Sequence, residues 1–239
     1  MRSDAHPPAI IAHRGASADA LENTLAALAL ALRQGADAIE LDLRATSDGE
    51  LVLLHDETLE RTAGDPRVLA EMTSAELREI DDPVRPPSLA EVLDCFGDGT
   101  DYLIEVKRIP GPCERGLIDA IVSRGLRERV VVQSFDHLLL RRLSLRDPRL
   151  EVAALLAPPA DHRRSLKLVS PFVQGIGPCA AATDAELVAT AHRRGLAVRS
   201  WTVNDEFEMQ RLIALGVDAL ITDVPGRARA LVGATALAA

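Results

Sequence analysis

The sequence is poor in aromatic residues, in cysteine and in positive charge. Its 239 residues include one tryptophan, one tyrosine, four phenylalanines and three cysteines. The cysteines, at positions 95, 113 and 179, form no C-x-x-C pair and cannot all be paired with one another, which is typical of free thiols in a reducing compartment. With 27 lysines and arginines against 36 aspartates and glutamates, the net charge is −9, which argues against nucleic acid or an anionic membrane as a partner.

Long apolar runs are also absent. No run approaches the roughly 20 residues that span a bilayer, and the amino terminus lacks the basic stretch and the apolar run of a signal peptide. We therefore expect no membrane insertion and a cytoplasmic location. A chain of this length buries roughly 70% of the surface that it exposes when unfolded, which is enough for one sizeable core. No linker or low-complexity segment divides it, so we expect a single domain over 1–239.

What the sequence does contain is a recurring unit of an apolar helical pattern, a glycine and a β-rich run. The glycines of this unit are Gly35, Gly125, Gly195 and Gly216, each placed where a helix ends in a left-handed residue. Continuously apolar runs such as 130–132 are typical of parallel strands that are covered on both faces. Strands are predicted at 9–13, 37–43 with an adjunct at 51–55, 101–107, 130–134, 151–155, 171–176, 197–203 and 218–222.

Eight such strands alternating with helices favour a (β/α)8 barrel. An open doubly wound sheet is the alternative, because the units between 150 and 176 are assigned mostly by elimination. The segment 57–88 is too long for a plain connection between a strand and a helix, and we interpret it as an insertion over one barrel mouth.

Charged residues gather at the predicted carboxyl ends of the first strands, which is where barrels of this kind carry out chemistry. Glu40 and Asp42 are two residues apart and therefore point to the same side of their strand, and Glu105 and Lys107 repeat that spacing on the next strand. Three carboxylates at one pole resist ionising together unless a cation joins them. All-oxygen ligation suits Mg²⁺, Ca²⁺ or Mn²⁺. The alternative is that the carboxylates only form salt bridges with Lys107 and Arg14.

Two histidines, His13 and His55, also end strands. Beside a metal that holds a phosphoryl oxygen, two imidazoles on opposite sides of phosphorus can activate the incoming oxygen and protonate the leaving one. Arg14 and Lys107 would add the fixed positive charge that retains an anion. The residues by themselves therefore indicate phosphodiester chemistry.

These residues belong to a longer series of motifs, in order from residue 10 to about 225, in which the sequence resembles the glycerophosphodiester phosphodiesterase family. The motifs are His13-Arg14-Gly15, Glu22-Asn23-Thr24, residues 35–42, His55-Asp56, Glu105-Val106-Lys107, Trp201-Thr202-Val203-Asn204, residues 216–218 and Ile221-Thr222-Asp223.

The resemblance implies a (β/α)8 barrel that hydrolyses small-molecule glycerophosphodiesters to sn-glycerol 3-phosphate and an alcohol. It also implies one divalent cation on Glu40, Asp42 and Glu105, with His13 and His55 as the acid and base pair, and a small insertion after the second strand, where 57–88 lies. Leu21 stands where the family usually has proline.

For four further residues or groups, the sequence predicts either two alternative roles or a structural role alone. Trp201 either walls the substrate pocket or packs in the core. Asp19 to Glu22 have the spacing of a helix capping box, whereas the family favours a place for Glu22 near the mouth. Asp223 is interpreted as a turn or cap residue before Pro225. The remaining histidines are expected on the surface, at positions 6, 137, 162 and 192.

Three other functions are weighed against this one. A phospholipid-cleaving relative resembling sphingomyelinase D shares the barrel and both histidines, but such proteins are secreted and bind lipid surfaces. A catalytically silent barrel that binds phosphorylated ligands would be favoured by the loss of a ligand or a histidine, and none is missing. A metal-free enzyme using Glu105 and Lys107 would leave both histidines unexplained. The sequence indicates no preferred oligomeric state.

Overall fold

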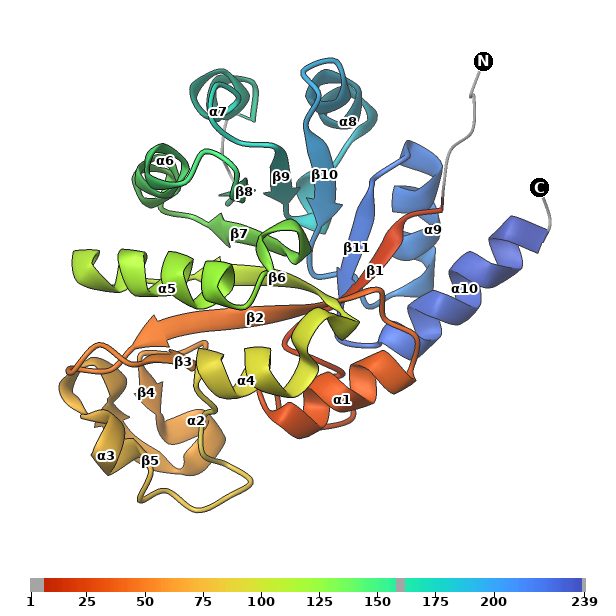
Figure 1. The fold of residues 1–239 in the computed structure, drawn as a ribbon. Helices are drawn as coiled ribbons and strands as arrows, with labels where there is room; N and C mark the ends of the chain where they lie inside the picture. The colour runs from red at the N-terminus through yellow and green to blue at the C-terminus, as the bar shows by residue number, and fades with distance from the viewer. Residues whose placement is uncertain (1–6, 158–161, 238–239) are drawn as a thin grey trace.

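The fold, seen in a computed structural model that describes residues 7–157 and 162–237, is a closed barrel of parallel strands with helices outside it (Figure 1). Its eight parallel strands among these residues are β1 (Ala9–Ala12), β2 (Ala38–Ala45), β6 (Asp101–Val106), β7 (Val130–Ser134), β8 (Glu151–Leu156), β9 (Gly175–Pro178), β10 (Ala197–Ser200) and β11 (Ala219–Thr222). Each pairs with its neighbours in the ring, and β1 closes it by pairing with both β11 and β2. The predicted (β/α)8 barrel is confirmed, and the open sheet is excluded.

The helices that cover the barrel follow the strands in turn. They are α1 (Leu25–Arg33), α4 (Leu89–Phe96), α5 (Gly111–Ser123), α6 (His137–Arg146), α7 (His162–Val169), α8 (Ala185–His192), α9 (Glu206–Leu215) and α10 (Pro225–Leu237), with short 3-10 turns at Gly97–Gly99, Arg127–Arg129 and Ala180–Ala182. All four glycines predicted to follow helices have positive φ angles, between 71° and 86°. Over the described residues, no helix is both long and apolar enough to cross a bilayer.

Alternation along the strands divides the core in two. On β2, Ile39, Leu41 and Leu43 point outward and are buried against the helices, in the main apolar core. Ala38, on the same strand but with opposite parity, belongs to a separate small cluster with Ile11, Leu103, Ala219 and Ile221 from three other strands. This second cluster fills the barrel interior, because inward-facing residues recur every second position. Glu40 and Asp42 share the parity of Ala38 and therefore also face the interior.

The insertion after the second barrel strand forms a small unit at one edge of the molecule, beside β2 in Figure 1. β3 (Leu51–Leu53), which pairs antiparallel with β2, leads into it, and its elements are β4 (Thr58–Leu59), α2 (Glu60–Ala63), β5 (Asp65–Val68), a 3-10 turn (Leu69–Glu71) and α3 (Ser74–Leu77). Its residues Leu59, Leu69, Met72 and Leu77 form a buried cluster with Val52 and Leu54 of the preceding segment. This apolar cluster explains why a segment this long is ordered rather than a bare loop.

One strand was placed wrongly from the sequence. The sixth strand is predicted at 171–176, but β9 begins at Gly175. The residues before it form a turn that follows α7, in which the amides of Phe172 and Val173 donate to the carbonyl of Val169. The predicted seventh strand is also too long, since β10 ends at Ser200 and only an isolated bridge continues it at Trp201.

Candidate active site

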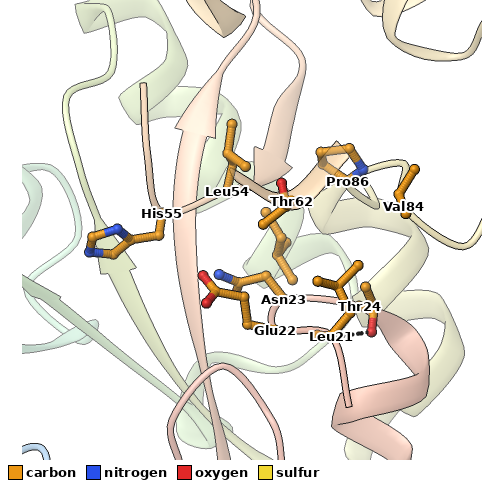
Figure 2. A pocket seen from close by; sticks show the side chains of 10 residues that line it. Leu21, Glu22, Asn23, Thr24, Leu54, His55, Thr62, Val84 and Pro86 are labelled. Carbon is orange, nitrogen blue, oxygen red and sulfur yellow. Dashed lines mark hydrogen bonds between the residues drawn. The ribbon is translucent and has the colours of Figure 1, made fainter. Parts of the chain in front are cut away.

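A cavity of about 260 Å³ opens at the carboxyl end of the barrel strands. Its lining brings together most of the sequence-predicted site residues, namely His13, Arg14, Glu40, His55, Glu105, Lys107 and Trp201, with Gln133, Phe135, Leu155, Thr202 and Ile221. Asp42, the remaining predicted site residue, is fully buried and lies against the cavity-lining residues Arg14 and Lys107. A much smaller pocket, of about 10 Å³, lies next to it between His55, Glu22 and the insertion (Figure 2), with room for about one water molecule.

The three predicted metal ligands are neighbours on adjacent strands. Asp42 on β2 is in register with Glu105 on β6, and Glu40 lies one inward-facing position earlier. One carboxylate oxygen from each of the three lies within 4.8 Å of the others, and all three residues are buried. Parallel pairing of β2 and β6 therefore produces the crowding of negative charge that the spacing in the sequence predicts.

Two basic side chains partly balance these carboxylates. Lys107 Nζ lies 2.9 Å from Asp42 Oδ1 and also contacts Glu105, and Arg14 Nε lies 2.8 Å from Asp42 Oδ2. Although burial opposes it, the positive charge of Lys107 and Arg14 holds the pKa of Asp42 below its ordinary value. The salt bridges considered as the alternative reading are thus present, and they centre on Asp42.

Glu40 is not neutralised in this way. Its Oε2 accepts a hydrogen bond of 3.0 Å from the backbone amide of Arg14, while its buried Oε1 has no hydrogen-bond partner. Burial, together with the negative charge of Asp42, raises the pKa of Glu40 to about 8. A buried carboxylate oxygen without a partner is costly, so this atom marks a place where the protein alone leaves the site incomplete.

The loop after β1 is shaped to meet these carboxylates. Arg14 and Gly15 both adopt left-handed φ angles, of 57° and 86°. A Cβ atom at Gly15 would lie 2.6 Å from the backbone carbon of Ala27 in α1, so only glycine fits. Asn23 is left-handed as well, with a φ of 55°, and its side-chain amide donates to Asp42 Oδ2 at 2.9 Å. The loop conformation therefore places two donors, the Arg14 amide at Glu40 and the Asn23 side chain at Asp42, against the acidic residues of β2.

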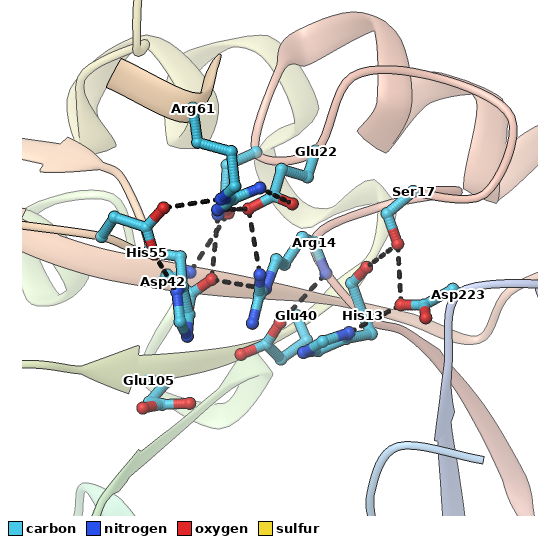
Figure 3. A network of polar contacts seen from close by, with 12 residues as sticks. His13, Arg14, Ser17, Glu22, Glu40, Asp42, His55, Arg61, Glu105 and Asp223 are labelled. Atoms are coloured by element: carbon cyan, nitrogen blue, oxygen red, sulfur yellow. Dashed lines mark hydrogen bonds and ion pairs between the residues drawn. The ribbon is translucent and has the colours of Figure 1, made fainter. Parts of the chain in front are cut away.

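His13 is held by a carboxylate from the other end of the chain (Figure 3). Its Nδ1 lies 2.7 Å from Asp223 Oδ1, and Asp223 in turn accepts hydrogen bonds from Ser17 Oγ at 2.8 Å and Asn204 Nδ2 at 2.5 Å. Burial lowers the pKa of His13, but the hydrogen bond to Asp223 and the charge of Glu40 outweigh it, so the pKa is raised. The interpretation of Asp223 as a mere turn or cap residue is wrong, because its carboxylate is directed at the histidine.

His55 is held in a parallel way from the insertion side. After β3 the chain stays beside the barrel because the Leu54 amide donates to the carbonyl of Asp42, which places His55 at the mouth. His55 Nδ1 lies 2.7 Å from Asp56 Oδ1, and the guanidinium of Arg44 holds the His55 carbonyl at 2.8 and 2.9 Å. In both histidines the Nδ1 is occupied by a carboxylate, which leaves Nε2 as the free ring nitrogen.

Glu22 belongs to the mouth rather than to a helix cap. The N-cap of α1 is Thr24, whose hydroxyl accepts from the Ala27 amide, so the capping box predicted from Asp19 is wrong. Thr24 is the N-cap residue because it lies directly before the first helical residue, Leu25. Glu22 instead accepts from Arg14 Nη1 at 3.0 Å and lines the small pocket beside the cavity.

An apolar wall faces the charged half of the cavity. Trp201 lies half-buried with its indole nitrogen donating to the Gly177 carbonyl at 2.7 Å, and its ring meets Phe135 edge to face with 5.7 Å between centroids. The structure thus places Trp201 at the pocket, the first of its two readings. Phe135 and Gln133 were not found from the sequence, although both follow the inward parity of β7, which is the signal that could have found them.

Of the described side chains, neither His137, His192 nor any of the three cysteines lines the cavity. His137 is half-buried against the Leu155 carbonyl, which corrects the expectation that it lies on the surface, and His192 is exposed and pairs with Asp218. His6 and the side chain of His162 lie outside the described residues. The three cysteines are free thiols, as expected.

Comparison with known proteins relates this geometry to one family. Residues 13–227 match the model of the glycerophosphoryl diester phosphodiesterase family. The chain is 37% identical over 237 residues to a glycerophosphodiester phosphodiesterase from Caldanaerobacter subterraneus, covering 90% of this chain and 94% of that one. It is 32% identical over 246 residues to a glycerophosphodiester phosphodiesterase from Bacillus subtilis, covering 90% and 83%.

Solved structures of phosphodiesterases resemble the fold of this chain over most of its length. A glycerophosphodiester phosphodiesterase from Thermotoga maritima matches with a TM-score of 0.82 and 27% identity, over 92% of this chain and 96% of that one. A phosphodiesterase from Oleispira antarctica, solved in complex with the product sn-glycerol-3-phosphate, matches with a TM-score of 0.81 and 27% identity, over 95% and 97%. The chain belongs to the glycerophosphoryl diester phosphodiesterase family.

Proposed function

We propose that this protein hydrolyses glycerophosphodiesters to sn-glycerol 3-phosphate and an alcohol, with a divalent cation and two catalytic histidines. The observation that carries the proposal is the cluster of Glu40, Asp42 and Glu105, whose ligand atoms lie within 4.8 Å of one another below a pocket rimmed by His13 and His55. The product bound to the Oleispira antarctica relative supports the same substrate class. We also propose that 1–239 form one domain in the cytoplasm, with 57–88 as its insertion.

The donor set fits a hard divalent cation such as Mg²⁺, Ca²⁺ or Mn²⁺. All three candidate ligands are carboxylates, and the partnerless Oε1 of Glu40 has the oxygen chemistry that these ions prefer. When bound, such a cation supplies positive charge that stabilises the negative charge building up on the phosphoryl oxygens. Glu40, Asp42 and Glu105 would hold it.

The remaining polar residues have roles around the phosphate. Arg14 and Lys107 line the pocket and bring positive charge to an otherwise acidic protein, so they would bind the phosphoryl oxygens. One histidine removes the proton of the attacking oxygen, which belongs to water or to the neighbouring glycerol hydroxyl, and the other protonates the departing alcohol. Trp201 and Phe135 form the apolar wall that limits where the substrate can lie.

Asp223 provides a prediction about His13. In the native protein the carboxylate of Asp223 fixes the ring of His13 and raises its pKa. Replacing Asp223 with asparagine removes that carboxylate. We expect kcat to fall by about 10-fold or more, since a misplaced catalytic group loses that much. We also expect the limb of the pH-rate profile that belongs to His13 to move to lower pH. An unchanged profile with unchanged kcat would show that Asp223 serves only the turn before Pro225.

The experiment that tests the function is a direct assay of product. Purified protein is freed of metal by chelation and incubated with glycerophosphocholine or glycerophosphoethanolamine, with Mg²⁺, Ca²⁺ or Mn²⁺ added one at a time. Release of sn-glycerol 3-phosphate that depends on the added ion is the expected result. Undiminished release after rigorous metal removal would contradict the role of the cation, and no release with any ion would contradict the function.

A further inference from the structure

Arg61, a residue of the insertion, joins the two arms of the site that hold His55 and Arg14 (Figure 3). It lies on α2 and forms ion pairs with Asp56 and Glu22, one the neighbour of His55 and the other the partner of Arg14. We propose that Arg61 is a positioning residue, through which the insertion fixes the orientation of His55 and Arg14 for hydrolysis. This inference rests on the proposed function.

The first arm leads from Arg61 to the imidazole. Arg61 Nε donates to Asp56 Oδ2 at 2.6 Å, and the other oxygen of the same carboxylate lies 2.7 Å from His55 Nδ1. The hydrogen bond from Arg61 is the main reason that the pKa of Asp56 is lowered to about 2. Because both carboxylate oxygens are engaged, the plane of Asp56 is fixed, and with it the direction in which the ring of His55 points.

The second arm leads to the phosphate-binding arginine. Arg61 Nη1 and Nη2 donate to the two oxygens of Glu22 at 2.7 and 2.8 Å, a bidentate pair. Glu22 Oε1 also accepts from Arg14 Nη1 at 3.0 Å. Paired guanidinium and carboxylate groups in this geometry resist rotation better than a single contact does. Arg61 therefore holds Glu22, and Glu22 holds one end of the Arg14 guanidinium.

The two histidines differ in what supports them. The carboxylate that holds His13 is fixed by Ser17 and Asn204, which both lie on loops of the barrel itself. The carboxylate that holds His55 is fixed by a side chain of the insertion, whose buried residues belong to a separate small cluster. Arg44 donates two hydrogen bonds to the His55 carbonyl, which fix the main chain of His55 rather than its ring. The orientation of the His55 ring thus depends on how the insertion is docked, whereas that of His13 does not.

The chain offers a matched control for Arg61. Arg67 lies in the same insertion, on β5, and its side chain is 46% exposed against 48% for Arg61. It forms an ion pair with a carboxylate as well, Asp65, but within its own strand. Replacing either arginine with methionine removes one charge and keeps most of the side-chain length. Only the substitution at position 61 is expected to affect catalysis.

The test compares Arg61→Met, Arg61→Lys and Arg67→Met in the metal-loaded enzyme, with thermal unfolding measured alongside kcat and KM. We expect Arg61→Met to lower kcat by about 10–100-fold and to raise KM, because displacement of a catalytic group by an ångström has effects of that size. Arg61→Lys should restore part of kcat, since an ammonium can bind one carboxylate at a time. Arg67→Met should stay within about twofold of the unsubstituted enzyme, as exposed ion pairs contribute little.

A double substitution distinguishes positioning from stability. Because Arg61 acts on kcat partly through Asp56, Arg61→Met combined with Asp56→Asn should lower kcat by less than the product of the two single effects. Equal kcat in Arg61→Met and Arg67→Met would overturn the inference, as would fully additive effects on kcat in the double variant. If Arg61→Met does not fold, the same comparison is made with Arg61→Lys, alone and combined with Asp56→Asn. Failure of the unsubstituted enzyme to hydrolyse any glycerophosphodiester would instead contradict the proposed function.

Discussion

Replacing His13 or His55 with alanine is expected to lower kcat by about 10²–10⁴-fold, the usual contribution of one proton-transferring group. The fold should persist, because both side chains lie at the mouth of the barrel and neither belongs to an apolar core cluster. In His13→Ala, Asp223 keeps its hydrogen bonds to Ser17 and Asn204 and is not left unpaired. The measurement is steady-state hydrolysis with saturating metal, together with the midpoint of thermal unfolding.

His192 provides the control for this experiment. Its Nε2 lies 2.9 Å from Asp218 Oδ2, so it is another histidine paired with a carboxylate, but Asp218 lines a cavity at the opposite, amino-terminal end of the strands. His192→Ala should leave kcat within about twofold of the unsubstituted enzyme, as expected for an exposed pair. Near-normal turnover in both His13→Ala and His55→Ala would show that the acid and base assignment is wrong.

Glu40→Gln is expected to weaken binding of the divalent cation by at least about 10–100-fold, since even groups that only support a ligand have effects of that size. Glutamine has nearly the same shape and still accepts the hydrogen bond from the Arg14 amide through its oxygen. Its amide nitrogen, however, would then occupy the place of the partnerless Oε1. Activity at low metal concentration should fall steeply and recover in part when more metal is added.

Two features of the chain make this prediction measurable without activity. The single tryptophan, Trp201, lines the same cavity as Glu40, so a titration with paramagnetic Mn²⁺ should quench its fluorescence. Glu114 is equally buried, but it is paired with Arg142 and Arg146 on α6, outside the cavity. Glu114→Gln should therefore leave the Mn²⁺ titration unchanged. An identical titration curve for Glu40→Gln would contradict the assignment of Glu40 as a ligand.

The part of the site that lies on strands could be predicted from the sequence because strand geometry is regular. Glu40 and Asp42 share a face at a spacing of two, and parallel strands end at the same mouth, so Glu105 had to come near them. The same regularity places His13 and Trp201. The alternation of strands with helices predicts a parallel α/β fold, and the count of eight strands favours a barrel over an open doubly wound sheet.

The rest depends on contacts between distant segments, for which the sequence carries no local signal. Asp223 meets His13 across 210 residues, and Arg61 meets Glu22 across 39. Both contacts are set by closure of the barrel and docking of the insertion, which are tertiary events. The misplaced sixth strand has a different cause, since the apolar residues Phe172 and Val173, in the turn after α7, resemble the start of a strand. Helix and strand cannot be told apart in such a short apolar run.

The most direct test of the central claim is a crystal structure of the protein grown with Mn²⁺ and sn-glycerol 3-phosphate, with anomalous scattering used to locate the metal. The account predicts one anomalous peak in contact with oxygen atoms of Glu40, Asp42 and Glu105, and a phosphate between the rings of His13 and His55. A peak at any other place, or a phosphate bound away from both imidazoles, would contradict it.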